Sequence, residues 1–329
     1  MVPATTLDRA PAVQRIEFRA MGCAMALYTA SGDPSAEERL RAAHALIDRA
    51  EERLSRFRDS SELSRLNARP GRPVAVSADV WNVLAGAMEA ARRTRGLYDP
   101  TILADLESAG YDRSFRAGLD RDGGTIPQAT ARARRSWADV VLDPDARTVT
   151  LPPGVRLDFG GIGKAWAAEQ AAAALAAAGP CLVDAGGDIA ARGAPAGRPG
   201  WPVGITDPHA PDRTLTTLAI ADGAVATSGT DVRRWRRGAQ KCHHVIDPRT
   251  GRPAQTDLWS VTVVAANAVD ANVHAVAALI LGSEEGLRYL AAQPGVEGLA
   301  VRRDRQLRCT AGFVHCIWPG TRAGGLDHG

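Results

Sequence analysis

Lysine is almost missing from this sequence of 329 residues: it occurs only as Lys164 and Lys241, and arginine supplies the other positive charges. Aromatic residues are also scarce, at 5% of the chain. Lysine and arginine together number 40 against 37 acidic residues, so the net charge is +3 and no basic block stands apart. This balance gives no support to nucleic-acid binding, which needs a concentrated positive surface.

Long apolar runs and paired cysteines are lacking as well. No segment approaches the roughly 18 apolar residues of a membrane-spanning helix, and residues 1–20 contain no apolar run of the kind found in signal peptides. The five cysteines are odd in number and show no C-x-x-C spacing, so they indicate neither a metal site nor a disulfide framework. Free thiols are typical of a reducing compartment. We expect a cytoplasmic protein with no membrane or nucleic-acid partner.

What the chain does contain is a hydrophobic content of 45%, enough for a sizeable core. Apolar residues at helical spacing and short apolar runs between turn residues predict the elements. The predicted helices cover residues 35–54, 78–95, 164–178 and 268–281, and the predicted strands cover 14–30, a hairpin at 140–151, 203–206, 215–221, 260–266, and closing strands between 299 and 318. Residues 112–136 are expected to form an exposed excursion. Helices and strands in this irregular order indicate an α+β fold.

The most informative stretch is residues 157–166, which read LDFGGIGKAW. We interpret it as a buried strand that breaks at glycines and then opens an alanine-rich helix. Glycines allow a ligand to approach the backbone closely, and the start of a helix offers free N–H groups to an anion. Lys164 lies in that first turn. The segment is therefore either a phosphate-binding turn or an ordinary helix start with a solvated lysine.

Further motifs follow in order along the chain. They are AMGC at 20–23, LSRF at 54–57, SELSRLN at 61–67, GLYDPT at 96–101, CLVDAGGDI at 181–189, ATSG at 226–229 and HHVIDPRTG at 243–251. Together with residues 157–166 they resemble the FAD:protein FMN transferase (ApbE) family over nearly the whole chain. The resemblance implies an ApbE-like, tunnelling-fold-related α+β architecture of mixed sheets and helices, with two closely packed lobes around an FAD cleft. It implies one domain over residues 14–318, with flexible tails at 1–13 and 319–329.

The function implied by the resemblance is a transferase reaction. Members of the family move FMN from FAD to a threonine or serine hydroxyl of a target flavoprotein and release AMP. FAD and that flavoprotein are therefore the expected partners. The resemblance places the catalytic roles on His244 and Lys164. It places these residues at the FAD: Met21, Phe57, Leu97, Tyr98, Asp99, Asp158, Gly160, Gly161, Lys164 and His244.

For several of these residues, the sequence alone allows a second role. His244 is either a base or phosphate donor, or an exposed loop histidine. Asp158 either caps the amides of the glycine turn or binds the flavin nucleotide. Phe57 and Tyr98 either contact a flat ring or belong to the core. We expect Asp188 and Asp247 to hold their own loops through local hydrogen bonds.

The metal position departs from the family pattern. In the family, an aspartate and a threonine one helical turn apart ligate Mg²⁺ together with a backbone carbonyl of the glycine turn, here Gly161. Those two positions correspond to Asn272 and Val276. An amide oxygen can ligate Mg²⁺ without adding charge, whereas valine cannot ligate it. We expect weak Mg²⁺ binding that requires FAD; a shifted register would instead use Asp270 and His274.

Three functions remain open at this stage. The first is FMN transfer. The second is a non-catalytic, metal-free, flavin-binding member of the same family. The third is a diverged enzyme that uses the pocket for other chemistry on a nucleotide. Release of AMP from FAD would separate the first from the second.

Overall fold

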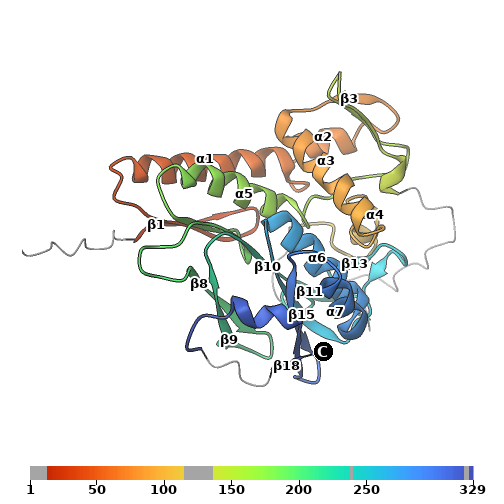
Figure 1. The fold of residues 1–329 in the computed structure, drawn as a ribbon. Helices are drawn as coiled ribbons and strands as arrows, with labels where there is room; N and C mark the ends of the chain where they lie inside the picture. The colour runs from red at the N-terminus through yellow and green to blue at the C-terminus, as the bar shows by residue number, and fades with distance from the viewer. Residues whose placement is uncertain (1–12, 115–135, 238–239, 322–325, 329) are drawn as a thin grey trace, which may run out of the picture.

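A nine-stranded sheet forms the centre of the fold (Figure 1). The computed structural model describes residues 13–114, 136–237, 240–321 and 326–328. Every neighbouring pair in the sheet is antiparallel except the last, which is parallel. In spatial order the strands are β1 (Val13–Ala20), β2 (Cys23–Ala30), β6 (Cys181–Asp184), β7 (Asp188–Arg192), β10 (Gly223–Gly229), β15 (Leu258–Ala265), β16 (Glu297–Arg302), β17 (Leu307–Cys309) and β18 (Leu326–His328). This antiparallel sheet with helices confirms the α+β prediction.

Helices cover one face of the sheet. They are α1 (Ala36–Leu54), α5 (Gly163–Ala176), α6 (Ala268–Leu281) and α7 (Ser283–Ala291). Alanines on α5 and α6 bring the helix backbones close to the strands, and these helices form the main core with β2, β6, β10 and β15. The helices predicted at 35–54, 164–178 and 268–281 are confirmed. Among the described residues, no helix is both long and apolar enough to cross a membrane.

The other face of the sheet is covered by the hairpin of β8 (Trp201–Asp207) and β9 (Ala210–Ile220) and by the 3₁₀ helix η2 (Ala311–Cys316). The closing strand expected between residues 313 and 318 is therefore wrong. A 3₁₀ helix brings residues three apart onto one side, and here Phe313 and Cys316 both pack into the cluster beneath the hairpin. Only one isolated bridge, Leu218 to Ile317, remains strand-like.

A smaller helical part adjoins the C-terminal end of α1 (Figure 1). It contains α2 (Glu62–Asn67), α3 (Ala78–Arg93), α4 (Leu103–Ser108), the 3₁₀ helix η1 (Trp137–Asp139), and a three-stranded sheet of β3 (Pro73–Ala75), β5 (Thr148–Thr150) and β4 (Val141–Asp143). The predicted helix at 78–95 and hairpin at 140–151 are confirmed. The predicted excursion at 112–136 lies mostly outside the described residues.

Two short ribbons complete the fold: β11 (Arg234–Arg237) with β12 (Gln240–His243), and β13 (Ile246–Asp247) with β14 (Arg252–Pro253). Trp235 and Cys242 of the first ribbon pack against Leu106 and Tyr111, at and beyond the end of α4. The indole of Trp235 donates to the Ala109 carbonyl oxygen at 2.8 Å. This small cluster fixes the ribbon that carries the histidine motif against the helical part.

Three further expectations need correction. Residues 14–30 form two strands, β1 and β2, rather than one. Residues 157–159 form no strand, because the backbone of Leu157 is paired by the side-chain amide of Asn67, at 2.8 and 2.9 Å, instead of by a neighbouring strand. In the expected tail at 319–329, Leu326–His328 pairs with β17. The expected tail at 1–13 lies outside the described residues except for Val13, which begins β1.

Candidate functional site

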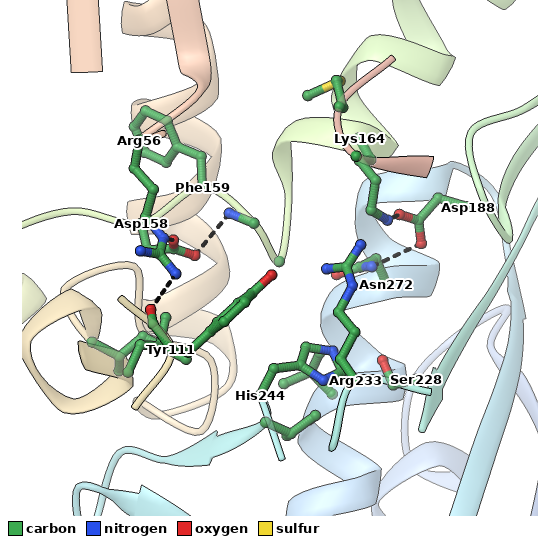
Figure 2. Close-up of a pocket in the computed structure, with 18 of the residues that line it drawn as sticks. Arg56, Tyr111, Asp158, Phe159, Lys164, Asp188, Ser228, Arg233, His244 and Asn272 are labelled. Carbon is green, nitrogen blue, oxygen red and sulfur yellow. Dashed lines mark hydrogen bonds and ion pairs between the residues drawn. The ribbon is translucent and has the colours of Figure 1, made fainter. Parts of the chain in front are cut away.

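One cavity of about 640 Å³ collects every residue that the sequence placed at the FAD or the metal. Its lining comes from the turn before β2, the end of α1, the segments around α4, the glycine turn before α5, the end of β10, the histidine motif and α6 (Figure 2). The predicted residues on its wall are Met21, Phe57, Leu97, Tyr98, Asp99, Asp158, Gly160, Gly161, Lys164, His244, Asn272 and Val276. Motifs separated by up to 255 positions therefore share one site.

The turn between β1 and β2 presents Met21 to the cavity. Met21 and Gly22 both have positive φ, 50° and 76°, between the paired residues Ala20 and Cys23. A two-residue hairpin turn with positive φ at both positions matches the twist of the flanking strands. Methionine rarely adopts this conformation, and strained backbone of this kind gathers at functional sites.

A buried ion pair between Arg56 and Asp158 lies at the cavity wall. Arg56 Nε lies 2.6 Å from Asp158 Oδ2, and both side chains are almost fully buried. Arg56 also donates to the carbonyl oxygen of Tyr111 at 2.7 Å, and the Gly160 amide donates to Asp158 Oδ1 at 2.8 Å. The sequence allowed Asp158 either to cap the amides of the glycine turn or to bind the flavin nucleotide. The structure shows the capping contact, because the Asp158 carboxylate accepts from the Gly160 amide. A Cβ at position 160 would lie 2.8 Å from that carboxylate, so the close approach requires glycine.

Aromatic rings line the same end of the cavity. The Arg56 guanidinium lies 4.1 Å from the centre of the Phe57 ring and 4.8 Å from that of Tyr111. Phe57 packs edge-on to Tyr111, which stacks on Trp235 with ring centres 5.6 Å apart. The Phe57 side chain is exposed, so it is not a core residue. An exposed ring held by a cation and a second ring is suited to contact a flat ligand.

Tyr98 also lines the cavity. It is buried, and its hydroxyl has no hydrogen-bond partner among the described residues. Burial raises the pKa of Tyr98 well above its usual range, and Asp158 and Asp99 raise it further. The hydroxyl is therefore a neutral donor, and a buried donor without a partner costs free energy unless a ligand satisfies it.

A polar cluster forms the other end of the cavity: Lys164, Asp188 and Asn272 (Figure 2). Lys164 forms an ion pair with Asp188 Oδ2. Asn272 Nδ2 donates to Asp188 Oδ1 at 2.8 Å, while Asn272 Oδ1 is buried and has no partner in the part of the chain that the structure describes. The prediction that Asp188 holds only its own loop is wrong, because its partners come from α5 and α6. Asp247 does bind locally, to the backbone and side chain of Arg249.

Arg233 and His244 lie beside this cluster, and Arg233 extends toward it (Figure 2). Burial lowers the pKa of His244 to about 3, and the positive charges of Arg233 and Lys164 lower it further. His244 is half-buried, so the alternative of an exposed loop histidine is wrong. Its Nδ1 is buried and has no hydrogen-bond partner within residues 13–114, 136–237 and 240–321. At neutral pH its imidazole is uncharged and can accept a proton.

The structure decides the register at the metal position. Asn272 and Val276 of α6 both line the cavity, whereas Asp270 and His274 do not. Asp270 forms an ion pair with Arg93, and His274 Nδ1 lies 2.7 Å from the Tyr289 hydroxyl. The shifted register with Asp270 and His274 is therefore wrong. Asn267 caps α6 by accepting from the Asp270 amide, which fixes where the helix begins.

Sequence reasoning missed three contributors to the site: Arg56, Tyr111 and Arg233. Arg56 belongs to the LSRF motif at 54–57. Its buried partner Asp158 lies 102 positions away, so no local pattern in the sequence links the two residues. Tyr111 lies beyond the GLYDPT motif. Arg233 belongs to a basic stretch whose only sequence signal was a run of arginines.

Comparisons with known proteins agree with the motifs. Residues 21–300 match the model of the ApbE family. The FAD:protein FMN transferase of Treponema pallidum is 31% identical over 306 residues, which cover 89% of this chain and 84% of that protein. A protein of the same name from Klebsiella pneumoniae is 29% identical over 273 residues, 80% of this chain and 81% of that one.

Solved structures give the same assignment. The apo form of the flavinyl transferase ApbE from Pseudomonas stutzeri superposes with a TM-score of 0.80 at 26% identity, covering 95% of this chain and 99% of that one. The ApbE protein of Thermotoga maritima shares the fold, with a TM-score of 0.81 at 23% identity and coverage of 93% and 99%. From these matches and the motifs gathered in one cavity, the chain belongs to the ApbE family.

Proposed function

We propose that this chain is an FAD:protein FMN transferase, which moves FMN from FAD to a threonine or serine hydroxyl of a target flavoprotein and releases AMP. The observation that carries the proposal is the single cavity with an exposed aromatic ring at one end and two cations at the other. FAD has a flat flavin ring and a pyrophosphate, and each end of the cavity complements one of them.

The reaction is a phosphoryl-group transfer in which positioning and charge do most of the work. The acceptor oxygen forms a bond to the phosphorus on the FMN side, and the bond from that phosphorus to the bridging oxygen breaks. AMP leaves with the bridging oxygen, and the hydroxyl proton passes to a base. The uncharged imidazole of His244 lies beside the polar cluster and is our candidate for that base.

The other lining residues have binding roles in this proposal. Phe57 and the Leu97-Tyr98-Asp99 segment contact the flavin nucleotide, and the Tyr98 hydroxyl donates to it. Met21 closes the cavity from the turn before β2. Asp158 accepts from the Gly160 amide and so holds the glycine turn in a conformation that leaves it accessible to the phosphates. Lys164 faces the pyrophosphate, and Asp188 positions its ammonium.

A mass measurement tests the transfer. The protein is incubated with FAD, Mg²⁺ and a panel of threonine- and serine-containing peptides, and adduct mass and released AMP are measured together. A gain equal to FMN on a peptide, with AMP in the same amount, is the expected result. The His244→Asn variant should lose at least about 10²-fold of the rate. A wild-type rate in that variant would remove His244 from the reaction.

The alternative is a flavin-binding member without catalysis, favoured by Asn272 and Val276 at the family's metal positions. FAD bound without AMP release, with every acceptor tried, would support it. We also propose a cytoplasmic location. The support is that all five cysteines, each within the described residues, are free thiols.

A further inference from the structure

The contact between Asn272 and Asp188 determines what the polar cluster can bind. A carboxylate only accepts hydrogen bonds, so the group facing Asp188 Oδ1 at 2.8 Å must be the amide nitrogen of Asn272. An aspartate at position 272 would instead bring two carboxylates into contact. Such a pair is stable only with a cation or a proton between the two groups. In this chain the asparagine satisfies Asp188 directly, and no bridging cation is needed.

The donor set does not fit Mg²⁺. This ion is usually held by one or two carboxylates in a near-octahedral oxygen shell. At the cluster, the Asp188 carboxylate is already paired with the Lys164 ammonium and the Asn272 amide. Val276 contributes only methyl groups to the cavity wall. What remains in this cluster is one uncharged oxygen, Asn272 Oδ1, which is buried and has no partner among the residues that the structure covers.

Arg233 provides positive charge at the same place. Its guanidinium has no hydrogen-bond or ion-pair partner among the residues the structure describes, although it is half-buried at the cavity wall. Lys164 and Arg233 act on the same region, because both lower the pKa of His244 and both oppose the rise in the pKa of Cys23. Counted together, Lys164, Arg233 and Asp188 carry a net charge of +1 at this end of the cavity. Arginine is well suited to bind two phosphate oxygens at once.

We infer that Lys164 and Arg233 supply the charge on the FAD pyrophosphate that a divalent metal supplies in relatives with the aspartate and threonine. FMN transfer by this chain is then independent of Mg²⁺. The inference rests on the proposed function. As the bridging bond breaks, negative charge grows on the departing AMP oxygen, and a guanidinium placed there stabilises it without a metal.

Binding measurements test the inference separately from catalysis. FAD affinity is measured by flavin fluorescence in EDTA and in Mg²⁺, for the wild type, Arg233→Gln and Arg234→Gln. Arg234 is a matched control, since its exposed side chain lies over the Trp259 ring, 5.8 Å away, and does not line the FAD cavity. We expect equal FAD affinity in both buffers for the wild type. Arg233→Gln should weaken FAD binding by about 10- to 100-fold, and Arg234→Gln by less than about 2-fold.

Riboflavin, which has the ring but no phosphate, serves as the second probe. Its affinity should be unchanged by Arg233→Gln if this side chain binds the pyrophosphate. Two results would overturn the inference. One is wild-type FAD affinity that rises tenfold or more with Mg²⁺; the other is equal FAD affinity in the wild type and Arg233→Gln.

Restoring the family's ligands provides the converse test. In Asn272→Asp with Val276→Thr, the new carboxylate faces Asp188, so Mg²⁺ should raise the melting temperature of this variant and leave that of the wild type unchanged. Transfer by the wild type should be the same in EDTA and Mg²⁺. Transfer that stops in EDTA and returns with Mg²⁺ would overturn the inference and leave the transferase function intact. If no buffer gives transfer, the proposed function fails, while the affinity measurements still decide how the pyrophosphate is bound.

Discussion

The substitution Asp158→Asn removes one charge from the buried ion pair and changes little else. Asparagine has nearly the same shape, and its oxygen can still accept from the Gly160 amide. Arg56 keeps its bond to the Tyr111 carbonyl and its position over two aromatic rings. What it loses is the carboxylate 2.6 Å from Nε, and its side chain is only 6% exposed to water.

The magnitude follows from that burial. Removing one partner of a buried pair leaves an uncompensated charge and typically costs about 3–5 kcal/mol. The two rings and the carbonyl group remain and offset part of this cost. We therefore expect Asp158→Asn to lower the free energy of unfolding by about 3 kcal/mol. Asp158→Ala should cost about 1 kcal/mol more, because the Gly160 amide then loses its acceptor as well.

Urea unfolding followed by tryptophan fluorescence measures this change, with the slope m checked for constancy. Arg56→Met alone and the double variant Arg56→Met with Asp158→Asn complete the cycle and supply the control. The double variant removes both charges, so no uncompensated charge stays buried. We expect the double variant to be more stable than Asp158→Asn alone, which gives a large coupling energy in the cycle.

Two outcomes would refute this reasoning. If Asp158→Asn costs less than about 1 kcal/mol, the carboxylate charge does not hold Arg56. If the two single changes add without coupling, the residues do not act as a pair.

Three further predictions concern other parts of the site. Burial lowers the pKa values of His243 and His244 to about 4 and about 3, below the ordinary 6.5, so their stabilising contribution is complete above about pH 6.5 and decreases as the pH falls. The free energies of unfolding measured in urea at pH 7.5 and 5 should differ by up to about 2 kcal/mol per histidine, and glutamine at either position should reduce the difference; equal free energies at the two pH values would contradict it. Phe57→Ala should weaken FAD binding by about tenfold in a fluorescence titration, with a melting temperature close to wild type because the ring is exposed; unchanged affinity would place the flavin elsewhere. Asn67→Ala should cost about 2–3 kcal/mol in urea unfolding because it leaves both backbone groups of Leu157 unpaired, and a cost below about 0.5 kcal/mol would show that water replaces the amide.

Local patterns in the sequence determined most of the helices and the position of many site residues. Apolar residues at helical spacing set the ends of α1 and α6 to within one residue of those observed. The glycine turn could be recognised from the sequence because glycines followed by an apolar helix form a local pattern. The site positions themselves came from the resemblance to the ApbE family, and all twelve of them line the cavity.

The tertiary structure alone decided how the charged residues are paired. Asp188 looked like a local loop residue, yet it binds Lys164 and Asn272, which are 24 and 84 positions away. The same applies to Arg56 with Asp158, and to Leu157, whose backbone is paired by the Asn67 side chain. Hydrophobic periodicity reflects which face of one element is buried, and it carries no record of which distant group will satisfy a buried charge or amide. That choice is made when the elements pack, so it can be read only from the folded chain.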